Sequence, residues 1–304
     1  MTTINPSVNK IKNLITRAKE YVIELFSTPA RRRIAIFYAL AILCALIFLF
    51  PPFWMLVTSL RTTKDIYQIP PTFWPSSITL ENYRYVLTEM DGGLRYFINS
   101  IVITLSTVFL VTLFSAMGGY AFGMRKFRGK ELMFMGVIFV LTIPYIMYLV
   151  PIYLIEINLH IRNTWLGLIL PYIALNLPWG LLIMRSAFST ISLEIRDAAT
   201  IDGCNEYQLW YKVMLPITKP ALAATIVITF VFVWQEFLFA STLMTKNTWQ
   251  TIPVGIVWLR DELQTMAYGR VGAMFILALL PIFIPFILLR NFFVKGLREG
   301  MLKG

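Results

Sequence analysis

Residues 191–216 read ISLEIRDAATIDGCNEYQLWYKVMLP and form a polar interval between two long apolar runs. The run before it, 163–184, has no charged residue, and the run after it, 220–245, has only Glu236. About 20 apolar residues suffice to cross the ~30 Å hydrocarbon core of a bilayer. Both runs are therefore long enough to span a membrane, and the interval between them is predicted to lie at one membrane surface.

Four further runs without any Asp, Glu, Lys or Arg bring the number of predicted spans to six. They cover residues 34–60, 96–124, 132–155 and 271–289. Hydrophobic residues make up 58% of the chain and charged residues 14%, against about 25% charged in soluble domains. The sequence therefore predicts an all-α integral membrane protein with six transmembrane helices, several of them kinked by internal prolines.

The basic residues are distributed unevenly between the connections. Nineteen of the 27 Lys and Arg residues fall on one side of the predicted membrane, in 1–33, 125–130, 185–219 and the tail after 289. Positively charged connections favour the cytoplasmic side. We therefore expect both termini and the polar interval in the cytoplasm, and we read the net charge of +11 as an orientation signal rather than as a nucleic-acid surface.

These assignments divide the chain into four parts. Residues 1–33 form a cytoplasmic segment, in which the spacing over 11–26 predicts an amphipathic helix that lies on the lipid surface or docks to a partner. Residues 34–60 are the first span, followed by an extracytoplasmic loop at 61–95. Residues 96–293 hold the other five helices and the loop 185–219, and 294–304 form a cytoplasmic tail.

Few residues are suited to catalysis. A single histidine, in a short outer loop, cannot complete a Ser/His/Asp or Cys/His set with the residues of the cytoplasmic side. The two cysteines, Cys44 and Cys204, lie in the first span and on the reducing side, so no disulfide is expected. The sequence predicts no enzyme, no metal site and no cofactor bound by the chain itself.

Local signals in the interval 191–216 predict two short helices joined by a corner. Ser192 and Asn205 are suited to cap the two helices, and Gly203 is suited to the left-handed conformation that ends the first. The predicted apolar faces are Ile191, Ile195, Ala198 and Ala199 on the first helix, and Tyr207, Trp210, Tyr211 and Met214 on the second. Such a segment serves either as a stabilising surface loop or as a docking element for a cytoplasmic partner.

The same interval resembles a known family signature. An acidic residue is followed by two alanines, and after fixed spacings by a glycine, an aliphatic residue and Leu-Pro: Asp197, Ala198, Ala199, Gly203, Val213, Leu215 and Pro216. This spacing is similar to the cytoplasmic signature of permease subunits of bacterial ABC importers, with Asp in place of the usual Glu and Val in place of the usual Ile. NYRYVL at 82–87, WQEFLFA at 234–240 and FVKGLREGMLKG at 293–304 resemble the carbohydrate importers, on the side of the small permease of maltose-type systems.

The resemblance implies a six-helix type I ABC importer permease fold in the bacterial inner membrane. It also implies four kinds of partner: a second permease subunit, two ATPase subunits, an extracytoplasmic sugar-binding protein and membrane lipid. ATP and Mg would be bound by the ATPase partners. The helix with the acidic residue and the two alanines would enter a cleft on the ATPase, and the segment with the seven signature residues would couple closure of the ATPases to sugar translocation.

Candidate residues for the translocation pathway come from the spans. Glu236 is an acid inside an apolar run, and such acids face protein interiors or water-filled cavities. If 220–245 is one helix, Thr225, Thr229, Phe232 and Glu236 share a face. Gln235 and Asn176 are the other candidates. Each of these residues either lines a pathway or holds the helices together.

Three alternatives stay open at this stage. The substrate of an ABC importer with this permease could instead be a peptide or an amino acid. A self-contained channel or proton-coupled carrier would use the intramembrane acid but would leave the pattern at 191–216 without a role. An enzyme would need catalytic sets that the sequence lacks.

Overall fold

The computed structural model describes residues 29–70, 72–262 and 268–301, with side chains for all of these except 260–262 and 291–301. The predicted amphipathic helix at 11–26 and the last residues of the predicted tail, 302–304, lie outside the described residues. The chain divides into two compact units, Met1–Val57 and Thr58–Gly304. We describe each unit by itself.

The described part of the first unit is one long helix, α2 (Pro29–Ser59), whose last two residues belong to the second unit. It contains Pro51 and Pro52 and no charged residue beyond Arg33. Large apolar side chains are exposed along its length, with Phe48 as the extreme at 78%. A helix that is apolar on all sides is suited to lipid, which agrees with the predicted first span.

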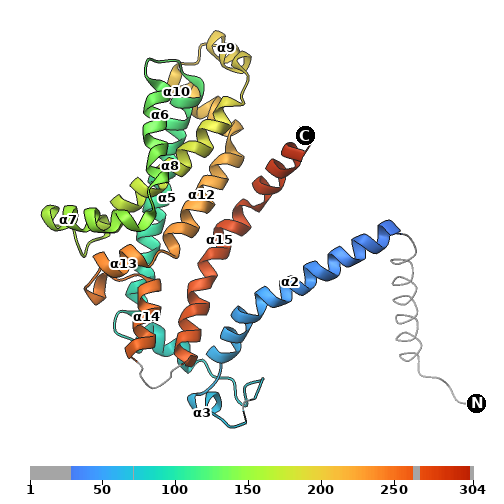
Figure 1. The fold of residues 1–304 in the computed structure, drawn as a ribbon, viewed down its shortest axis with the longest axis vertical. Coiled ribbons are helices and arrows are strands. Elements are labelled where there is room, and N and C mark those ends of the chain that lie inside the picture. Colours follow the sequence, from blue (N-terminus) through green and yellow to red (C-terminus); the bar gives the residue numbers. More distant parts are fainter. Residues whose placement is uncertain (1–28, 71, 263–267, 302–304) are drawn as a thin grey trace, which may run out of the picture. The chain divides into compact units, whose positions relative to one another are not determined.

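The second unit is a helical bundle built on the close packing of α5 (Gly93–Met124) against α8 (Trp165–Ser189). Glycines allow the close approach of these two helices. A Cβ added to Gly119 would lie 2.5 Å from Cβ of Met184, and one added to Gly180 would lie 2.2 Å from Oγ of Ser115. Small residues at such contacts are typical of helix pairs in membranes. Helix α12 (Lys219–Trp234) packs alongside this pair, and α15 (Tyr268–Met301) packs against α12 (Figure 1).

The described helices agree with the six predicted spans only if each pair of helices joined by a sharp bend is counted as one span. Four helices, α2, α5, α8 and α15, are long and apolar enough to cross a membrane. Two bent pairs, Lys130–Thr142 with Tyr145–Leu159 and Glu206–Ile217 with Lys219–Trp234, raise the number to six if each is one span. The chain is therefore a multi-pass membrane protein, with two predicted spans more broken than the sequence indicates.

The predicted third span, 132–155, is not a single helix. It consists of α6 (Lys130–Phe139), η2 (Val140–Thr142), η3 (Tyr145–Tyr148) and α7 (Leu149–Leu159), with a bend of 100° at the break. Pro144 causes the break, because a residue before proline is driven out of the helical conformation. Ile143 is accordingly extended, with ψ 126°. Figure 1 shows α7 leaving the bundle at a steep angle.

The predicted fifth span, 220–245, is also interrupted, which corrects the prediction that Glu236 shares a helical face with Thr225 and Thr229. Helix α12 ends at Trp234, and a second short helix, α13, runs from Leu238 to Leu243. Glu236 lies in the break between them. The sixteen residues of α12 extend about 24 Å at 1.5 Å per residue.

The predicted outer loop 61–95 is ordered and contains α3 (Thr63–Ile66), α4 (Glu81–Arg84) and the π-helical η1 (Tyr85–Glu89). Buried polar side chains hold it in place. Asn82 Nδ2 donates to the carbonyls of Ser59 and Arg61 at 2.9 and 2.8 Å, and Asp65 accepts two hydrogen bonds from Ser76.

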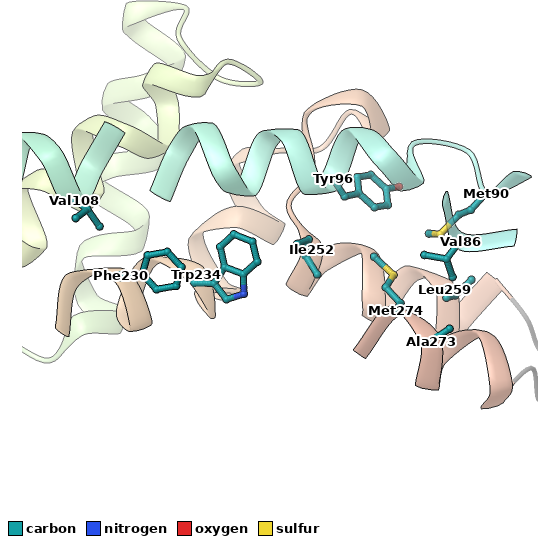
Figure 2. Close-up of a cluster of buried hydrophobic side chains, with 10 residues drawn as sticks. All are labelled: Val86, Met90, Tyr96, Val108, Phe230, Trp234, Ile252, Leu259, Ala273 and Met274. Atoms are coloured by element: carbon teal, nitrogen blue, oxygen red, sulfur yellow. The ribbon is translucent and has the colours of Figure 1, made fainter. Parts of the chain in front are cut away.

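At the same end of the bundle lie η5 (Asn247–Trp249) and α14 (Ile252–Glu262). Figure 2 shows the apolar cluster that joins α14 and α15 to η1, α5 and α12, with Tyr96 and Ile252 among its central side chains. At the opposite end of the bundle lie α9 (Leu193–Ile201), α10 (Glu206–Gln208), η4 (Leu209–Met214) and α11 (Leu215–Ile217) (Figure 1).

Candidate functional site

The first predicted helix of the polar interval is α9, and its ends follow the predicted signals. The Ser192 side chain accepts a hydrogen bond from the backbone N–H of Glu194 at the start of the helix. After the helix, Gly203 has φ +82°, in the left-handed region that glycine adopts without steric cost. Both caps are confirmed. A Cβ added to Gly203 would meet no atom within 4 Å, so the glycine is required by the backbone alone.

The second predicted helix begins as expected but continues differently. Asn205 caps it with a reciprocal capping box, in which the side chains of Asn205 and Gln208 each bond the other's backbone N–H. Helix α10 then passes into the π-helical η4, Leu209–Met214. In a π-helix the hydrogen bonds run from residue i to i+5, so residues five apart lie on one face.

This change of period makes part of the predicted apolar face wrong. The buried side chains are Leu209 and Met214, at 1% and 0% exposure. Tyr207 and Tyr211, which an α-helical period places on the buried face, are 78% and 49% exposed. A sequence pattern read at 3.6 residues per turn cannot reveal a π-helical segment, so Leu209 was missed.

The seven signature residues have different surroundings. Asp197, Ala198, Gly203 and Pro216 are exposed, and Val213 and Leu215 are half-buried. Ala199 is the exception: it is only 8% exposed and belongs to an apolar cluster within the chain, with Ala116, Tyr120, Met124, Met184, Phe188, Leu209 and Met214. Ala199 therefore joins α9 to the bundle, while Ala198 beside it faces outward.

Polar contacts also fix this segment to α5. Glu206 on α10 accepts hydrogen bonds from the Tyr120 hydroxyl at 3.0 Å and from Arg125 at 2.5 Å. The indole N–H of Trp210 donates to the carbonyl of Ala116 at 3.4 Å. The basic turn 125–130 and the interval 191–216 therefore lie at the same end of the bundle, as the charge pattern predicts.

The exposed surface of the segment carries apolar side chains among its charged ones. Leu193, Ile195, Ile201 and Tyr207 are 52%, 41%, 86% and 78% exposed. These side chains lie at the end of the bundle, on short polar helices rather than on the long spans (Figure 1). Apolar groups exposed on a segment that also carries charge are typical of a surface that a protein partner covers.

The second candidate region surrounds Glu236 in the break between α12 and α13. The residue is 8% exposed. Its carboxylate accepts hydrogen bonds from the backbone N–H groups of Phe239 and Ala240, at 2.8 and 3.1 Å, and so caps the first turn of α13. The same carboxylate accepts from the hydroxyls of Tyr145, at 2.6 Å, and Tyr172.

Four donors satisfy the Glu236 carboxylate and join three parts of the chain. Tyr145 comes from η3, Tyr172 from α8, and the two amides from α13. Buried charge is tolerated where several hydrogen bonds replace water. This arrangement agrees with the structural interpretation of Glu236. The two tyrosines were missed by sequence analysis, because nothing in their local pattern distinguishes them from other aromatics of the spans.

Asn176 and Gln235 lie in different surroundings. Asn176 is 3% exposed, and its Nδ2 donates to the carbonyl of Tyr172 at 2.8 Å, within the helix that carries both. It is thus linked to Glu236 through Tyr172. Gln235 is exposed and, with Trp234, Ile252 and Phe275, lines a groove of about 200 Å³ between α12, α14 and α15. The structure therefore separates Gln235 from its neighbour Glu236.

Comparison with known proteins gives the following similarities. Residues 115–299, more than half of the chain, match the family of binding-protein-dependent transport system inner membrane components. The arabinooligosaccharides transport system permease protein AraQ of Halalkalibacterium halodurans is 33% identical over 86% of this chain and 93% of its own length. The sulfoquinovosyl glycerol transport system permease protein SmoH of Agrobacterium fabrum is 32% identical over 84% and 89%.

A solved structure has the same fold. It is the crystal structure of a bacterial ABC transporter involved in the import of the acidic polysaccharide alginate. One of its chains superposes with a TM-score of 0.74 and 22% identity, over 88% of this chain and 98% of that one. The broken helices and the polar interval therefore belong to a fold already known among ABC importers.

Proposed function

Because this chain belongs to the family of binding-protein-dependent transport system inner membrane components, we propose that it is a permease subunit of an ATP-driven sugar importer. The observation that carries the substrate class is similarity over most of the chain to permeases named for arabinooligosaccharide and sulfoquinovosyl glycerol transport. With a second permease it would form the transmembrane pathway. Two ATPase subunits would bind ATP and Mg, and an extracytoplasmic protein would deliver the sugar.

We place the ATPase contact on α9 and the corner after it. Asp197, Ala198 and the exposed apolar side chains Leu193 and Ile201 would enter a groove on the ATPase. Ala199, Leu209 and Met214 would transmit the movement of α9 to α5 and α8, because they pack it against those helices. We therefore propose that Ala199 contributes to coupling through its packing within this chain.

The function is tested by reconstitution. The chain, its partner permease and the ATPases are purified together and placed in proteoliposomes with the cognate binding protein. We expect uptake of a radiolabelled oligosaccharide that requires both ATP and the binding protein. Uptake of peptides or amino acids in place of sugars would refute the substrate class, and uptake driven by a proton gradient without ATP would refute the transporter class.

The orientation is tested by single cysteines in a chain whose Cys44 and Cys204 are replaced by serine. Exposed positions were chosen so that the label can reach them: Ser77 and Thr248 at one end of the bundle, and Asp202 at the other. With α9 in the cytoplasm, an impermeant thiol reagent labels the first two on whole cells and labels the third only after lysis. Labelling at Asp202 on intact cells would reverse the proposed orientation.

A further inference from the structure

A cavity of about 390 Å³ opens at the end of the bundle opposite α9, and nothing in the function described so far uses it. Its volume lies within the range of small-molecule sites, about 300–1,000 Å³. Its lining comes from the turn before α5, from α5 itself, from the segment between α13 and α14, and from α14. The lining residues are Met90, Asp91, Tyr96, Thr245, Asn247, Gln250 and Trp258.

Two of the polar lining groups are held in fixed positions. The Asn247 side chain accepts a hydrogen bond from the Tyr96 hydroxyl, and its Nδ2 donates to Asp91 Oδ2 at 2.8 Å. Tyr96 is itself 1% exposed and packed in the apolar cluster of Figure 2, beside the turn that carries Met90. Asp91 is itself exposed, and the hydrogen bond from Asn247 orients its carboxylate.

Gln250 is a third polar group in the wall, and it is nearly buried. It is 2% exposed, and no described residue donates a hydrogen bond to its Oε1. A buried amide oxygen without a donor costs about 1–3 kcal/mol. The backbone around Gln250 is fixed, because its carbonyl accepts from Asn99 Nδ2 at 2.9 Å. A ligand hydroxyl reaching this wall would supply the missing donor.

Trp258 provides an aromatic surface beside these polar groups. It lies on α14, faces the cavity and is 56% exposed. An indole face packs well against the C–H face of a sugar ring, because both are flat and weakly polar. An aromatic plane next to a carboxylate and planar amides therefore matches a ligand with one apolar face and a rim of hydroxyls.

The described lining also argues against charged ligands. It contains one carboxylate and no Lys or Arg. A free amino acid or a phosphorylated compound would bring an anionic group that no lining cation neutralises. Hydroxyls, in contrast, both donate and accept, so they can bond Asp91 and Gln250 at once.

From this geometry we infer that the cavity is a carbohydrate subsite, in which Trp258 stacks on a sugar ring and Asp91 and Gln250 bond its hydroxyls. The choice of ligand rests on the proposed function. The subsite lies at the predicted extracytoplasmic end, so it would hold the sugar near the mouth of the pathway, before it enters the spans. It is separate from the α9 segment and from Glu236.

The test measures binding directly and does not depend on transport. The permease–ATPase complex is placed in lipid nanodiscs without the binding protein, and saturation-transfer NMR is recorded with arabinotriose, maltotriose and diacetylchitobiose. We expect saturation transfer to at least one sugar. Trp258→Ala raises its dissociation constant about two- to tenfold, the range for loss of an aromatic stack. Asp91→Ala also weakens binding.

The matched control is Trp74→Ala. Trp74 is 63% exposed on the loop 61–95 but does not line the cavity, so its removal leaves sugar binding unchanged. Thermal melting of each variant complex checks that the fold is kept. No binding of any of the three sugars, or equal binding by the wild type and Trp258→Ala, would overturn the subsite.

The outcome for the subsite is distinguishable from the outcome for the proposed function. Sugar uptake with the binding protein, together with absent or Trp258-independent binding in nanodiscs, would overturn the subsite and leave the importer assignment standing. Sugar binding that depends on Trp258, in a complex that imports no sugar, would support the subsite and overturn the importer assignment.

Discussion

Glu236 and Glu206 both join separate helices through a carboxylate, but they do so in different parts of the bundle and in different surroundings. Glu236 is 8% exposed and accepts from two tyrosine hydroxyls and two backbone amides. Glu206 has a side chain that is 51% exposed and bonds Arg125 and Tyr120. The first is a buried junction. The second is a hydrated contact whose strength water and salt reduce.

The difference indicates where the chain is rigid and where it can move. The α12–α13 break is fixed by hydrogen bonds that have no solvent to replace them. The α9–η4 segment is held mainly by apolar packing of Ala199, Leu209 and Met214, with weak ionic contacts around it. A segment held in this way can move as a body when a partner binds its exposed face.

The largest effect is expected at Glu236. Glu236→Leu leaves two tyrosine hydroxyls and two amides without their acceptor, and hydrogen bonds to a charged group are worth about 1.5–3 kcal/mol each. We expect a loss of at least about 3 kcal/mol in stability, seen as low membrane abundance and a lower melting temperature. Glu236→Gln is the matched variant, since it keeps the shape and one acceptor oxygen, and it should be milder.

Sugar uptake distinguishes the two roles of Glu236. If it is a structural junction, both variants lose uptake in proportion to their lower abundance. If it lines the pathway, Glu236→Gln alters uptake per assembled complex while abundance stays normal. Normal abundance and normal uptake for Glu236→Leu would remove the residue from both roles.

The next effect is expected at Ala199, and the adjacent alanine provides the comparison. Ala199→Trp forces a large ring into a packed cluster, and overpacking costs about 1–3 kcal/mol or more. We expect α9 to detach from α5 and α8, so that limited proteolysis cleaves the chain between 190 and 205. Ala198→Trp, one residue away on the exposed side, should leave the protease pattern unchanged.

Both alanine variants should lose ATPase association, but for different reasons. Ala199→Trp loses it because the segment is displaced, and Ala198→Trp because the ring blocks the partner's approach. Co-purification of the ATPases beside the protease pattern separates these causes. Full ATPase binding and full uptake by both variants would show that the segment only stabilises the fold.

The caps of this region show how far sequence reasoning can reach. Ser192, Gly203 and Asn205 were predicted correctly, because a cap depends on residues close in sequence. Four of the six apolar runs likewise correspond to single long helices, α2, α5, α8 and α15. Internal prolines predicted kinked spans, and Pro144 accounts for the bend in the third, although its size of 100° was not predicted. The break at Glu236 and the π-helical η4 were not predicted. The break at Glu236 depends on hydrogen bonds with residues far along the chain, as with Tyr172.

The same limit applies to the candidate sites. The spacing of Asp197 to Pro216 indicated a candidate docking segment, but it could not show that Ala199 faces inward and Ala198 outward. The cavity beside Trp258 was not predicted, since Asp91 and Asn247 are brought together from distant positions. Only the fold gathers the aromatic and polar side chains of this cavity in one place.

A moderate effect is expected at Gly203. The residue has φ +82°, and a left-handed conformation costs a residue with a Cβ about 1–2 kcal/mol. No atom lies within 4 Å of an added Cβ, so Gly203→Ala isolates the backbone cost from any clash. Gly203→Val should cost more, because branched side chains tolerate this region poorly. ATPase stimulation by the binding protein should fall in the same order.

Gly136→Ala is the control for the glycine pair. Gly136 lies within α6, has ordinary helical backbone and also has no atom within 4 Å of an added Cβ. Alanine is favoured over glycine inside a helix by about 1 kcal/mol, so this variant should melt no lower than the wild type. Equal melting temperatures for Gly203→Ala and the wild type would mean that the corner needs no left-handed residue.

The smallest effect is expected at Glu206. An exposed ion pair is worth about 0–1 kcal/mol, so Glu206→Gln should lower stability by less than about 1 kcal/mol and leave membrane abundance normal. A double-mutant cycle with Arg125→Met measures the coupling between the two side chains. The coupling should shrink between about 0.05 and 0.5 M salt, because the Debye length falls from above 10 Å to well below it. Glu236→Gln, measured in parallel, should show no such salt dependence, since its partners are neutral and buried. A large, salt-independent coupling at Glu206 would mean that the α9–η4 segment is as firmly fixed as the α12–α13 break, and the contrast between a movable and a rigid region would be wrong.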